Sequence, residues 1–287
     1  MPAETSRIAL VTGASSGIGK QVAKALAARG WRVIGTGRDT ARMAMAEADI
    51  RAAAPDAQVE LLRADLSLIA EARALAAAVG ARTDRLDLLV NNAGGMTDRL
   101  VMTAEGLEAN FAGNHLGPFA LTQDLLPLLR AAAAGRPAGT VRILNTASDA
   151  SEMIPAINLD DLQNLDRFNP GLAYCTGKLA NVLFTRGLAD RLAADGIAVH
   201  AVHPGAVDSN FFTHAPADTR ERTEGIHKFT EEEGADTLIW LATGDAGGRD
   251  SGGYWFQRRL RAPNPLADDP ATVERFWQES ERLLPAP

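Results

Sequence analysis

Short apolar runs alternate with longer amphipathic stretches along most of the chain. The apolar runs are typical of buried parallel strands and lie at 7–12, 31–36, 58–63, 86–91, 139–147 and 197–202. Stretches with helical periodicity lie at 20–29, 40–54, 67–79, 104–133, 171–194 and 231–243. This alternation predicts an α/β fold, a doubly wound parallel sheet of about seven strands with helices on both faces.

Small and polar residues follow the expected strands at the points where the strands end. In a parallel sheet of this kind, ligands bind beyond the carboxyl ends of the strands. The residues at these ends are therefore the first candidates for a site. They lie at 13–19, 64–66, 91–94, 145–148 and 203–205.

A glycine turn with the spacing G-x-x-x-G-x-G follows the first strand. Gly13, Gly17 and Gly19 supply its glycines, and a helical stretch begins directly after it. Glycines let the backbone approach a pyrophosphate closely, and the N–H groups at the helix start are donors for an anion. The pattern favours a Rossmann-type nucleotide site. An ordinary turn between strand and helix is the alternative, because the spacing differs from G-x-G-x-x-G.

The residues at the end of the second strand predict which nicotinamide dinucleotide the protein binds. An acidic residue here would bind a free ribose 2′-hydroxyl, but Arg38 comes first and Asp39 follows. A guanidinium can pair with a 2′-phosphate. The sequence therefore predicts NADP(H) in preference to NAD(H), with Asp39 as the reason to keep NAD(H) as the alternative.

Tyr174 and Lys178 lie one helical turn apart in the expected helix 171–194. Residues at this spacing share a helix face. An ammonium about 5 Å from a phenolate contributes on the order of 3 kcal/mol at an effective dielectric of about 20, which is enough to move a phenol pKa from about 10 toward neutrality. We therefore expect Lys178 to lower the pKa of Tyr174, which would act as a proton donor and acceptor. A chance pair on a solvated helix is the alternative.

Composition narrows the classes of protein. The chain has 287 residues, 46% of them apolar, and no low-complexity stretch divides it into parts. We expect one domain over 1–287, with the nucleotide-binding half at about 7–147 and the catalytic helix and substrate loops at about 148–287. The apolar runs are too short to cross a bilayer and the first residues lack the pattern of a signal peptide, so we expect a cytoplasmic protein without a membrane partner.

Charge and the metal-binding residue types exclude further classes. The net charge of −7 argues against a nucleic-acid partner. The single cysteine, Cys175, rules out an internal disulfide. His200 and His203 are placed on opposite faces of a predicted strand, so no metal site is expected.

With these residues in view, the chain resembles the short-chain dehydrogenase/reductase superfamily from about residue 7 to residue 284. The resemblance rests on 12–19, 91–94, Asn114, Ser148, 174–178 and 204–205. The stretches 114–119 and 173–185 are similar to the retinol-dehydrogenase-like branch. The resemblance implies an NAD(P)-dependent oxidoreductase that moves a hydride between nicotinamide and the carbonyl or secondary alcohol of a hydrophobic small molecule.

The resemblance also implies roles for individual residues. Asn114, Ser148, Tyr174 and Lys178 would form the catalytic set, with Tyr174 as the acid, Ser148 as the donor to the substrate oxygen and Asn114 in a kinked helix. Thr146, Asp149 and Ser151 lie close enough to Ser148 to leave its register open. The cofactor would be contacted by Gly13, Ser15, Ser16, Gly17, Ile18, Gly19, Arg38, Asp65, Leu66, Asn92, Ala93, Gly94, Tyr174, Lys178, Pro204, Gly205 and Val207.

The sequence also suggests which residues contact the substrate. A long segment separates Ser148 from Tyr174, and we expect Ser148, Met153, Tyr174, Phe211 and Phe212 to contact the substrate. His214 and Phe229 belong to the same apolar group. The alternative is that these side chains cover the edge of the sheet.

Assembly and function each keep an alternative. In the family, helices like 104–133 and 171–194 pair between subunits, which implies a homodimer or homotetramer, with a monomer as the other possibility. Against the enzyme stands a catalytically silent dinucleotide-binding sensor or scaffold, which would be expected to have lost part of the catalytic set. An epimerase or dehydratase would need a larger domain after Gly205.

Thr230 with the three following glutamates predicts a helix cap.

Overall fold

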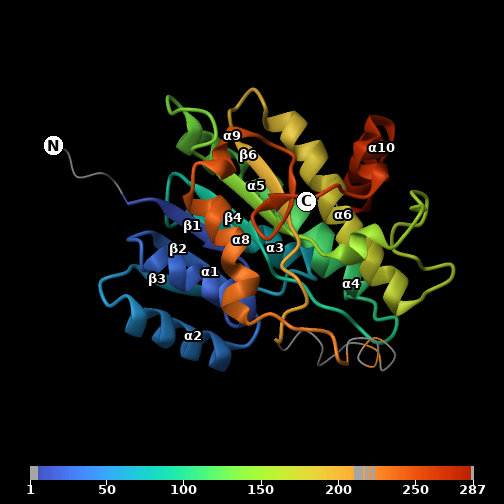
Figure 1. The fold of residues 1–287 in the computed structure, drawn as a ribbon, viewed down its shortest axis with the longest axis horizontal. Coiled ribbons are helices and arrows are strands. Elements are labelled where there is room, and N and C mark those ends of the chain that lie inside the picture. The colour runs from blue at the N-terminus through green and yellow to red at the C-terminus, as the bar shows by residue number, and fades with distance from the viewer. Residues whose placement is uncertain (1–5, 210–215, 217–218, 220, 222–223, 286–287) are drawn as a thin grey trace.

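A central eight-stranded sheet organises the computed structural model, which describes residues 6–209, 216, 219, 221 and 224–285 (Figure 1). The strand order is β3-β2-β1-β4-β5-β6-β7-β8. All neighbouring strands are parallel except β7 and β8. The predicted doubly wound parallel sheet is confirmed, with an antiparallel edge strand in addition. The strands are β1 (Ile8–Val11), β2 (Arg32–Gly37), β3 (Val59–Arg63), β4 (Leu88–Asn91), β5 (Arg142–Thr146), β6 (Ala198–Val202), β7 (Tyr254–Phe256) and β8 (Arg259–Leu260).

Helices cover both faces of this sheet (Figure 1). They are α1 (Gly17–Ala27), α2 (Thr40–Ala53), α3 (Ile69–Gly80), α4 (Ala109–Phe111), α5 (Gly117–Ala133), α6 (Pro170–Leu192), α8 (Glu231–Thr243), α9 (Ala246–Arg249) and α10 (Pro270–Leu283). A π-helical segment, η1 (Ala112–Leu116), joins α4 to α5. Within the described residues, η2 (Asp149–Glu152) and η4 (Pro265–Asp268) are 3-10 turns.

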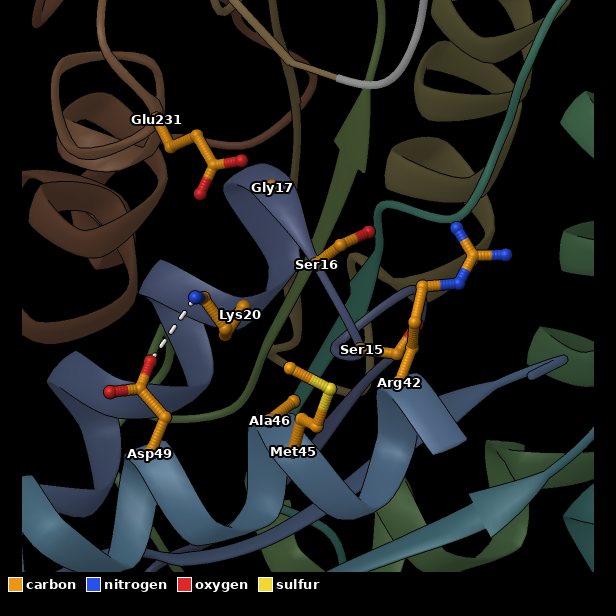
Figure 2. Close-up of a pocket in the computed structure, with 9 residues that line it drawn as sticks. All are labelled: Ser15, Ser16, Gly17, Lys20, Arg42, Met45, Ala46, Asp49 and Glu231. Carbon is orange, nitrogen blue, oxygen red and sulfur yellow. Dashed lines mark ion pairs between the residues drawn. The ribbon is translucent and has the colours of Figure 1, made fainter. Parts of the chain in front are cut away.

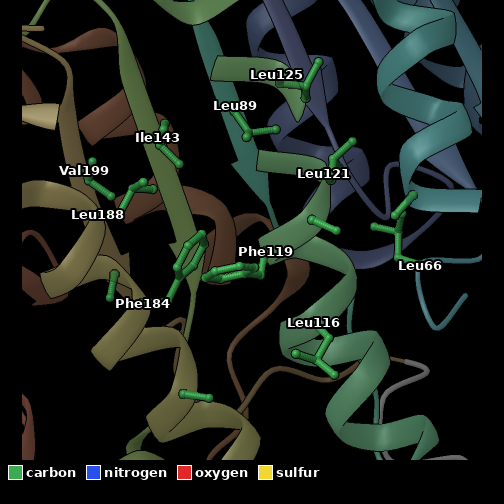
Figure 3. Packing of buried hydrophobic residues seen from close by; sticks show 14 of the residues in the cluster. Leu66, Leu89, Leu116, Phe119, Leu121, Leu125, Ile143, Phe184, Leu188 and Val199 are labelled. Carbon is green, nitrogen blue, oxygen red and sulfur yellow. The ribbon is translucent and has the colours of Figure 1, made fainter. Parts of the chain in front are cut away.

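Alternate strand residues form two separate cores. Leu89, Ile143 and Val199 pack on one face with side chains from α5 and α6, including Phe119 and Phe184 (Figure 3). Their strand neighbours point to the other face, where α1 and α8 cover them. This is the side-chain period of two that a pleated strand imposes. Because both faces are buried, the open edge for a ligand is the row of strand ends.

The predicted helix 104–133 is wrong at its start. Gly106 takes a left-handed φ of 74°, which ends regular structure there. Glu108 then caps the new helix start, its carboxylate accepting from the N–H groups of Asn110 at 2.9 Å and Phe111 at 2.6 Å. Helical structure therefore begins at Ala109, and the distortion expected at Asn114 takes the form of η1.

The helix α10 packs against α6 and closes an aromatic cluster. The ring of Trp277 lies 4.9 Å from that of Phe119, and the ring of Phe276 lies 4.8 Å from that of His115. Burial lowers the pKa of His115 to about 3. Part of the surface of α6 is thus covered by the chain itself. In the part of the chain that the structure describes, none of the helices has the length and apolar character needed to cross a bilayer.

Candidate active site

The ends of β1, β4, β5 and β6 meet at one edge of the sheet. In the register, Asn91 is opposite Asn145 and Asn145 is opposite Ala201. The Thr12 hydroxyl joins two of these ends by accepting from the N–H groups of Asn92 and Ala93, both at 2.9 Å. The predicted convergence of strand ends is therefore present, and hydrogen bonds hold it in place.

The glycine turn packs directly on the segment after β4. Gly13 and Gly17 take positive φ values of 69° and 59°. A Cβ at Gly19 would clash with the Gly13 carbonyl oxygen, and one at Gly13 would come 3.1 Å from the Cα of Ala93. Glycine therefore suits Gly13 and Gly17 through their left-handed backbone, and Gly13 and Gly19 through their close approach to neighbouring atoms.

A pocket of about 340 Å³ opens beside this turn (Figure 2). The Ser16 side chain makes no capping hydrogen bond to α1, so the first N–H groups of that helix remain available to an anion. This geometry fits the diphosphate of a dinucleotide. The pocket is lined by Ser15, Ser16, Gly17, Lys20, Arg42, Met45, Ala46, Asp49 and Glu231.

Arg38 and Asp39 have different roles at the end of β2. The Arg38 side chain is 69% exposed, and its guanidinium lies 3.9 Å from the Asp65 carboxylate. Asp39 instead caps α2, where its carboxylate accepts from the Arg42 N–H at 2.9 Å. That hydrogen bond holds the pKa of Asp39 below its usual value. The acidic residue that kept NAD(H) open is thus engaged with its own helix.

Tyr174 and Lys178 lie on the first turns of α6, as predicted. Asn169 caps this helix by accepting from the Leu172 N–H at 2.9 Å. The Lys178 amine donates to the Thr146 carbonyl at 3.3 Å and lies 5.7 Å from the centre of the Tyr174 ring. The helix cap and the end of β5 thus hold the pair at the edge of the sheet.

The predicted downward pKa shift of Tyr174 is wrong for this structure. Burial raises the pKa of the phenol above its usual value, and this outweighs a hydrogen bond with the Ser148 hydroxyl, which lowers it. The negative charge of Asp149 raises it further. Burial also lowers the pKa of Lys178 to about 8. The sequence argument counted the attraction between the two groups but not the cost of burying each of them.

Asn114 joins the same group through Gly94 and Gly95. Its side-chain amide donates to the Gly95 carbonyl at 2.8 Å, and its oxygen accepts from the Gly95 N–H at 3.3 Å. A Cβ at Gly94 would come 2.5 Å from the Asn114 oxygen and 3.5 Å from the Lys178 amine. Asn114, the segment after β4 and Lys178 are therefore in close contact.

Ser148 shares a hydrogen bond with Tyr174, which favours it over the neighbouring residues that the sequence left open. Its hydroxyl accepts from the Ala150 N–H at 3.2 Å and donates to the Asp149 carboxylate at 3.0 Å. Ser151 is fully buried, and its carbonyl accepts from Asn264 at 3.0 Å. The four candidate catalytic residues thus come from η1, the end of β5 and α6.

The structure describes some of the remaining predicted site residues but not all of them. Gly205 takes a φ of 89° and packs against Phe229, and Val207 forms a bridge with the same residue. The Met153 side chain is exposed at the end of η2. Phe211, Phe212 and His214 lie outside the described residues. Among those described, no group of three or more histidine, cysteine or carboxylate side chains is placed to hold a metal ion.

Sequence reasoning missed two contributors to the site. Thr12 organises the segment after β4, and its position directly before Gly13 was the available signal. The Thr146 carbonyl accepts from Lys178 and, at 3.0 Å, from the Asn181 side chain. A backbone carbonyl leaves no mark in the sequence, since every residue has one.

Comparison with known proteins agrees with this geometry. The family model described as short chain dehydrogenase matches residues 7–220. The chain belongs to the short-chain dehydrogenase family. It is therefore an oxidoreductase of a family that uses nicotinamide dinucleotides.

Individual members of the short-chain dehydrogenase family are similar over nearly the whole chain. Retinol dehydrogenase 12 of Homo sapiens is 38% identical over 97% of this chain and 86% of its own length. Retinol dehydrogenase 11 of Mus musculus is 36% identical over 98% of this chain and 87% of its own. These relatives confirm the retinol-dehydrogenase-like branch.

Solved structures of this family share the fold. Pseudomonas aeruginosa RhlG, solved as an active-site complex with NADP, has a TM-score of 0.70 and 32% identity, covering 86% of this chain and 93% of that one. A short-chain type dehydrogenase/reductase from Mycobacterium marinum has a TM-score of 0.69 and 25% identity, covering 86% and 92%.

Proposed function

We propose that this short-chain dehydrogenase prefers NADP(H) and moves a hydride between nicotinamide and the carbonyl or secondary alcohol of a hydrophobic small molecule. The observation that carries the proposal is the meeting of Ser148, Tyr174 and Lys178 at the strand ends, where Lys178 lies close to Gly94 in the segment on which the glycine turn packs. A proton donor, a hydrogen-bond donor and an amine stand together where the family binds its cofactor.

Each side chain has a defined task in carbonyl reduction. The bound nicotinamide ring supplies the hydride. Tyr174 gives its phenol proton to the carbonyl oxygen, and Ser148 donates a hydrogen bond where negative charge develops on that oxygen. Lys178 offers positive charge to the phenolate that remains. In alcohol oxidation the same groups work in reverse, with Tyr174 accepting the proton.

The preference for NADP(H) is supported by the environment of Arg38. Its guanidinium is exposed, while Asp39 is engaged at the start of α2. Arg42 and Ser15 line the neighbouring pocket, so positive charge and a hydroxyl surround the position for a 2′-phosphate (Figure 2). Positive side chains here favour the phosphorylated dinucleotide.

The substrate class is supported by the relatives and by exposed apolar residues close in the sequence to the candidate catalytic residues. The relatives are named for retinol, an apolar alcohol. Leu172 precedes Tyr174 by two positions and Met153 follows Ser148 by five, and both side chains are exposed. Exposed apolar side chains of this kind support an apolar substrate.

We extend the proposal to location and assembly. We expect a cytoplasmic protein that forms a homodimer or homotetramer. Because α10 covers part of α6, pairing must use the surface of α5 and α6 that this helix leaves open. Sedimentation at several protein concentrations tests this expectation.

The test of function is NADPH oxidation across a panel of ketones, aldehydes, retinal, steroids and polycyclic quinones. The proposal predicts turnover of apolar carbonyls, faster with NADPH than with NADH. Tight nucleotide binding with no turnover of any member would instead favour a dinucleotide sensor.

A further inference from the structure

Asp149 stands directly against the Ser148 hydroxyl. The hydroxyl has one proton, and it is directed to the Asp149 carboxylate at 3.0 Å. The Ser148 oxygen meanwhile accepts from the Ala150 N–H at 3.2 Å and shares a hydrogen bond with Tyr174. In this arrangement the single Ser148 proton is engaged by Asp149, so it is not directed to a substrate oxygen.

A buried histidine holds Asp149 from the other side. The Nδ1 of His203 accepts from the backbone N–H groups of Asp149 at 3.2 Å and Gly205 at 3.4 Å. These two donors leave the ring proton on Nε2, which lies 3.8 Å from the Asp149 carboxylate. The imidazole is 5% exposed and stacks on Phe256 at 4.6 Å. His203 thus links the segment that carries Ser148 and Asp149 to the turn at Pro204 and Gly205.

Other charges around this group are already paired. Glu152 faces the same space, but its carboxylate accepts from Nε and Nη2 of Arg261, each at 2.7 Å, and from the Tyr254 hydroxyl at 2.9 Å. Burial lowers the pKa of His203, the Asp149 charge raises it and the Arg261 charge lowers it. Asp149 is therefore the carboxylate whose charge acts on Ser148 and Tyr174.

We propose that Asp149 is a positioning residue, which draws the Ser148 proton away from the substrate oxygen and opposes negative charge on the Tyr174 phenol. The inference rests on the function proposed for this site. The Asp149 carboxylate slows the reaction, because it must rotate away from Ser148 toward His203 before the Ser148 hydroxyl can donate to the substrate oxygen. Carbonyl reduction is slowed by the lost donor, and alcohol oxidation is shifted to higher pH by the opposed phenolate.

Two substitutions separate these effects. Asp149→Asn removes the charge but keeps an oxygen that can accept from Ser148, whereas Asp149→Ala removes both. We expect both variants to move the acidic limb of alcohol oxidation to lower pH by about half a unit or more. Only Asp149→Ala should also raise kcat for carbonyl reduction at neutral pH, by about threefold to tenfold, because a freed donor is worth about 1 kcal/mol.

The matched control is Asp166→Asn, the same change of charge at an exposed position of the same loop. It should leave the pH profile and kcat unchanged. An equal pH shift in the control would overturn the inference, because it would show a general effect of net charge. An unchanged profile in both Asp149 variants would overturn it as well.

A readout without substrate keeps the inference separate from the proposed function. The chain has two tyrosines, so Tyr254→Phe leaves Tyr174 as the one phenol for NMR with isotope-labelled tyrosine. With NADP⁺ present, Tyr174 should begin to ionise at lower pH in Asp149→Ala than in the Tyr254→Phe parent. Absence of carbonyl turnover in the wild type would contradict the proposed function alone. A Tyr174 signal with the same pH response in both proteins would contradict the role of Asp149.

Discussion

The Lys178 amine lies 5.7 Å from the centre of the Tyr174 ring while donating to the Thr146 carbonyl at 3.3 Å. Lys178 is 4% exposed, and burial lowers the pKa of its amine to about 8. A cation in this position is costly to the fold, and the same burial raises the pKa of Tyr174. The buried amine that we propose acts in catalysis therefore lowers the stability of the fold.

Replacing Lys178 by methionine should stabilise the protein and abolish turnover. The pKa of about 8 lies below the ordinary 10.5, so the burial cost is complete below pH 8. Between pH 8 and 10.5 the unfolded wild type binds more protons than the folded one, so wild-type stability rises and the advantage of Lys178→Met shrinks. The gain at pH 7 is at most about 3 kcal/mol, less the lost hydrogen bond.

Urea unfolding at several pH values measures this difference. The control is Lys24→Met on the exposed side of α1, where the amine pairs with Asp49 at 3.6 Å. It should show no such dependence on pH. A Lys178→Met protein that is less stable than wild type at pH 7 would show that the amine is not costly in the fold.

Cofactor choice should depend on Arg38 and Arg42. We expect Arg38→Ala and Arg42→Ala each to reduce the preference for NADPH over NADH about tenfold, because each removes a charge worth about 1.4 kcal/mol to a phosphate. Arg51→Ala is the control on the same helix, since its guanidinium pairs with Glu47 at 2.8 Å. Titration with each nucleotide gives the ratio. An unchanged ratio in both variants removes the basis for preferring NADP(H).

Gly94 tests whether the contact between Asn114 and Lys178 is functional. A methyl group there would come 2.5 Å from the Asn114 oxygen, so Gly94→Ala should displace the amide and lower kcat by about a hundredfold. Gly80→Ala is the control, because its added methyl meets nothing within 4 Å. Thermal unfolding should show both variants folded. A Gly94→Ala enzyme with normal kcat would mean that this contact is not needed.

Much of the fold was predictable because the apolar periodicity records burial on both sheet faces. The strands ending at Asn91 and Thr146 were found this way. The cap of α8 was found from Thr230 and the glutamates after it, and Thr230 and Glu233 form the predicted capping box. The short edge strands β7 and β8 were not found. Strands of three and two residues have no period of their own and exist only through their neighbours.

The proximity of the candidate catalytic side chains was predicted, but their electrostatics were not. Ser148, Tyr174 and Lys178 meet as predicted. The direction of the Tyr174 pKa shift depends on how completely each group is buried and on Asp149, three positions after the end of β5. Burial follows from packing by segments far away in the sequence, so spacing along one helix does not determine it.

The most direct test of the proposed chemistry compares Tyr174→Phe with Tyr254→Phe. Both remove one phenol hydroxyl, but that of Tyr254 donates to Glu152 at 2.9 Å. NADPH consumption is measured with the best carbonyl substrate, and the NADPH Kd is measured for each protein. We predict that Tyr174→Phe loses turnover with a nearly unchanged Kd, while Tyr254→Phe stays active. A Tyr174→Phe enzyme that turns over at the wild-type rate would contradict the assignment of Tyr174 as the proton donor.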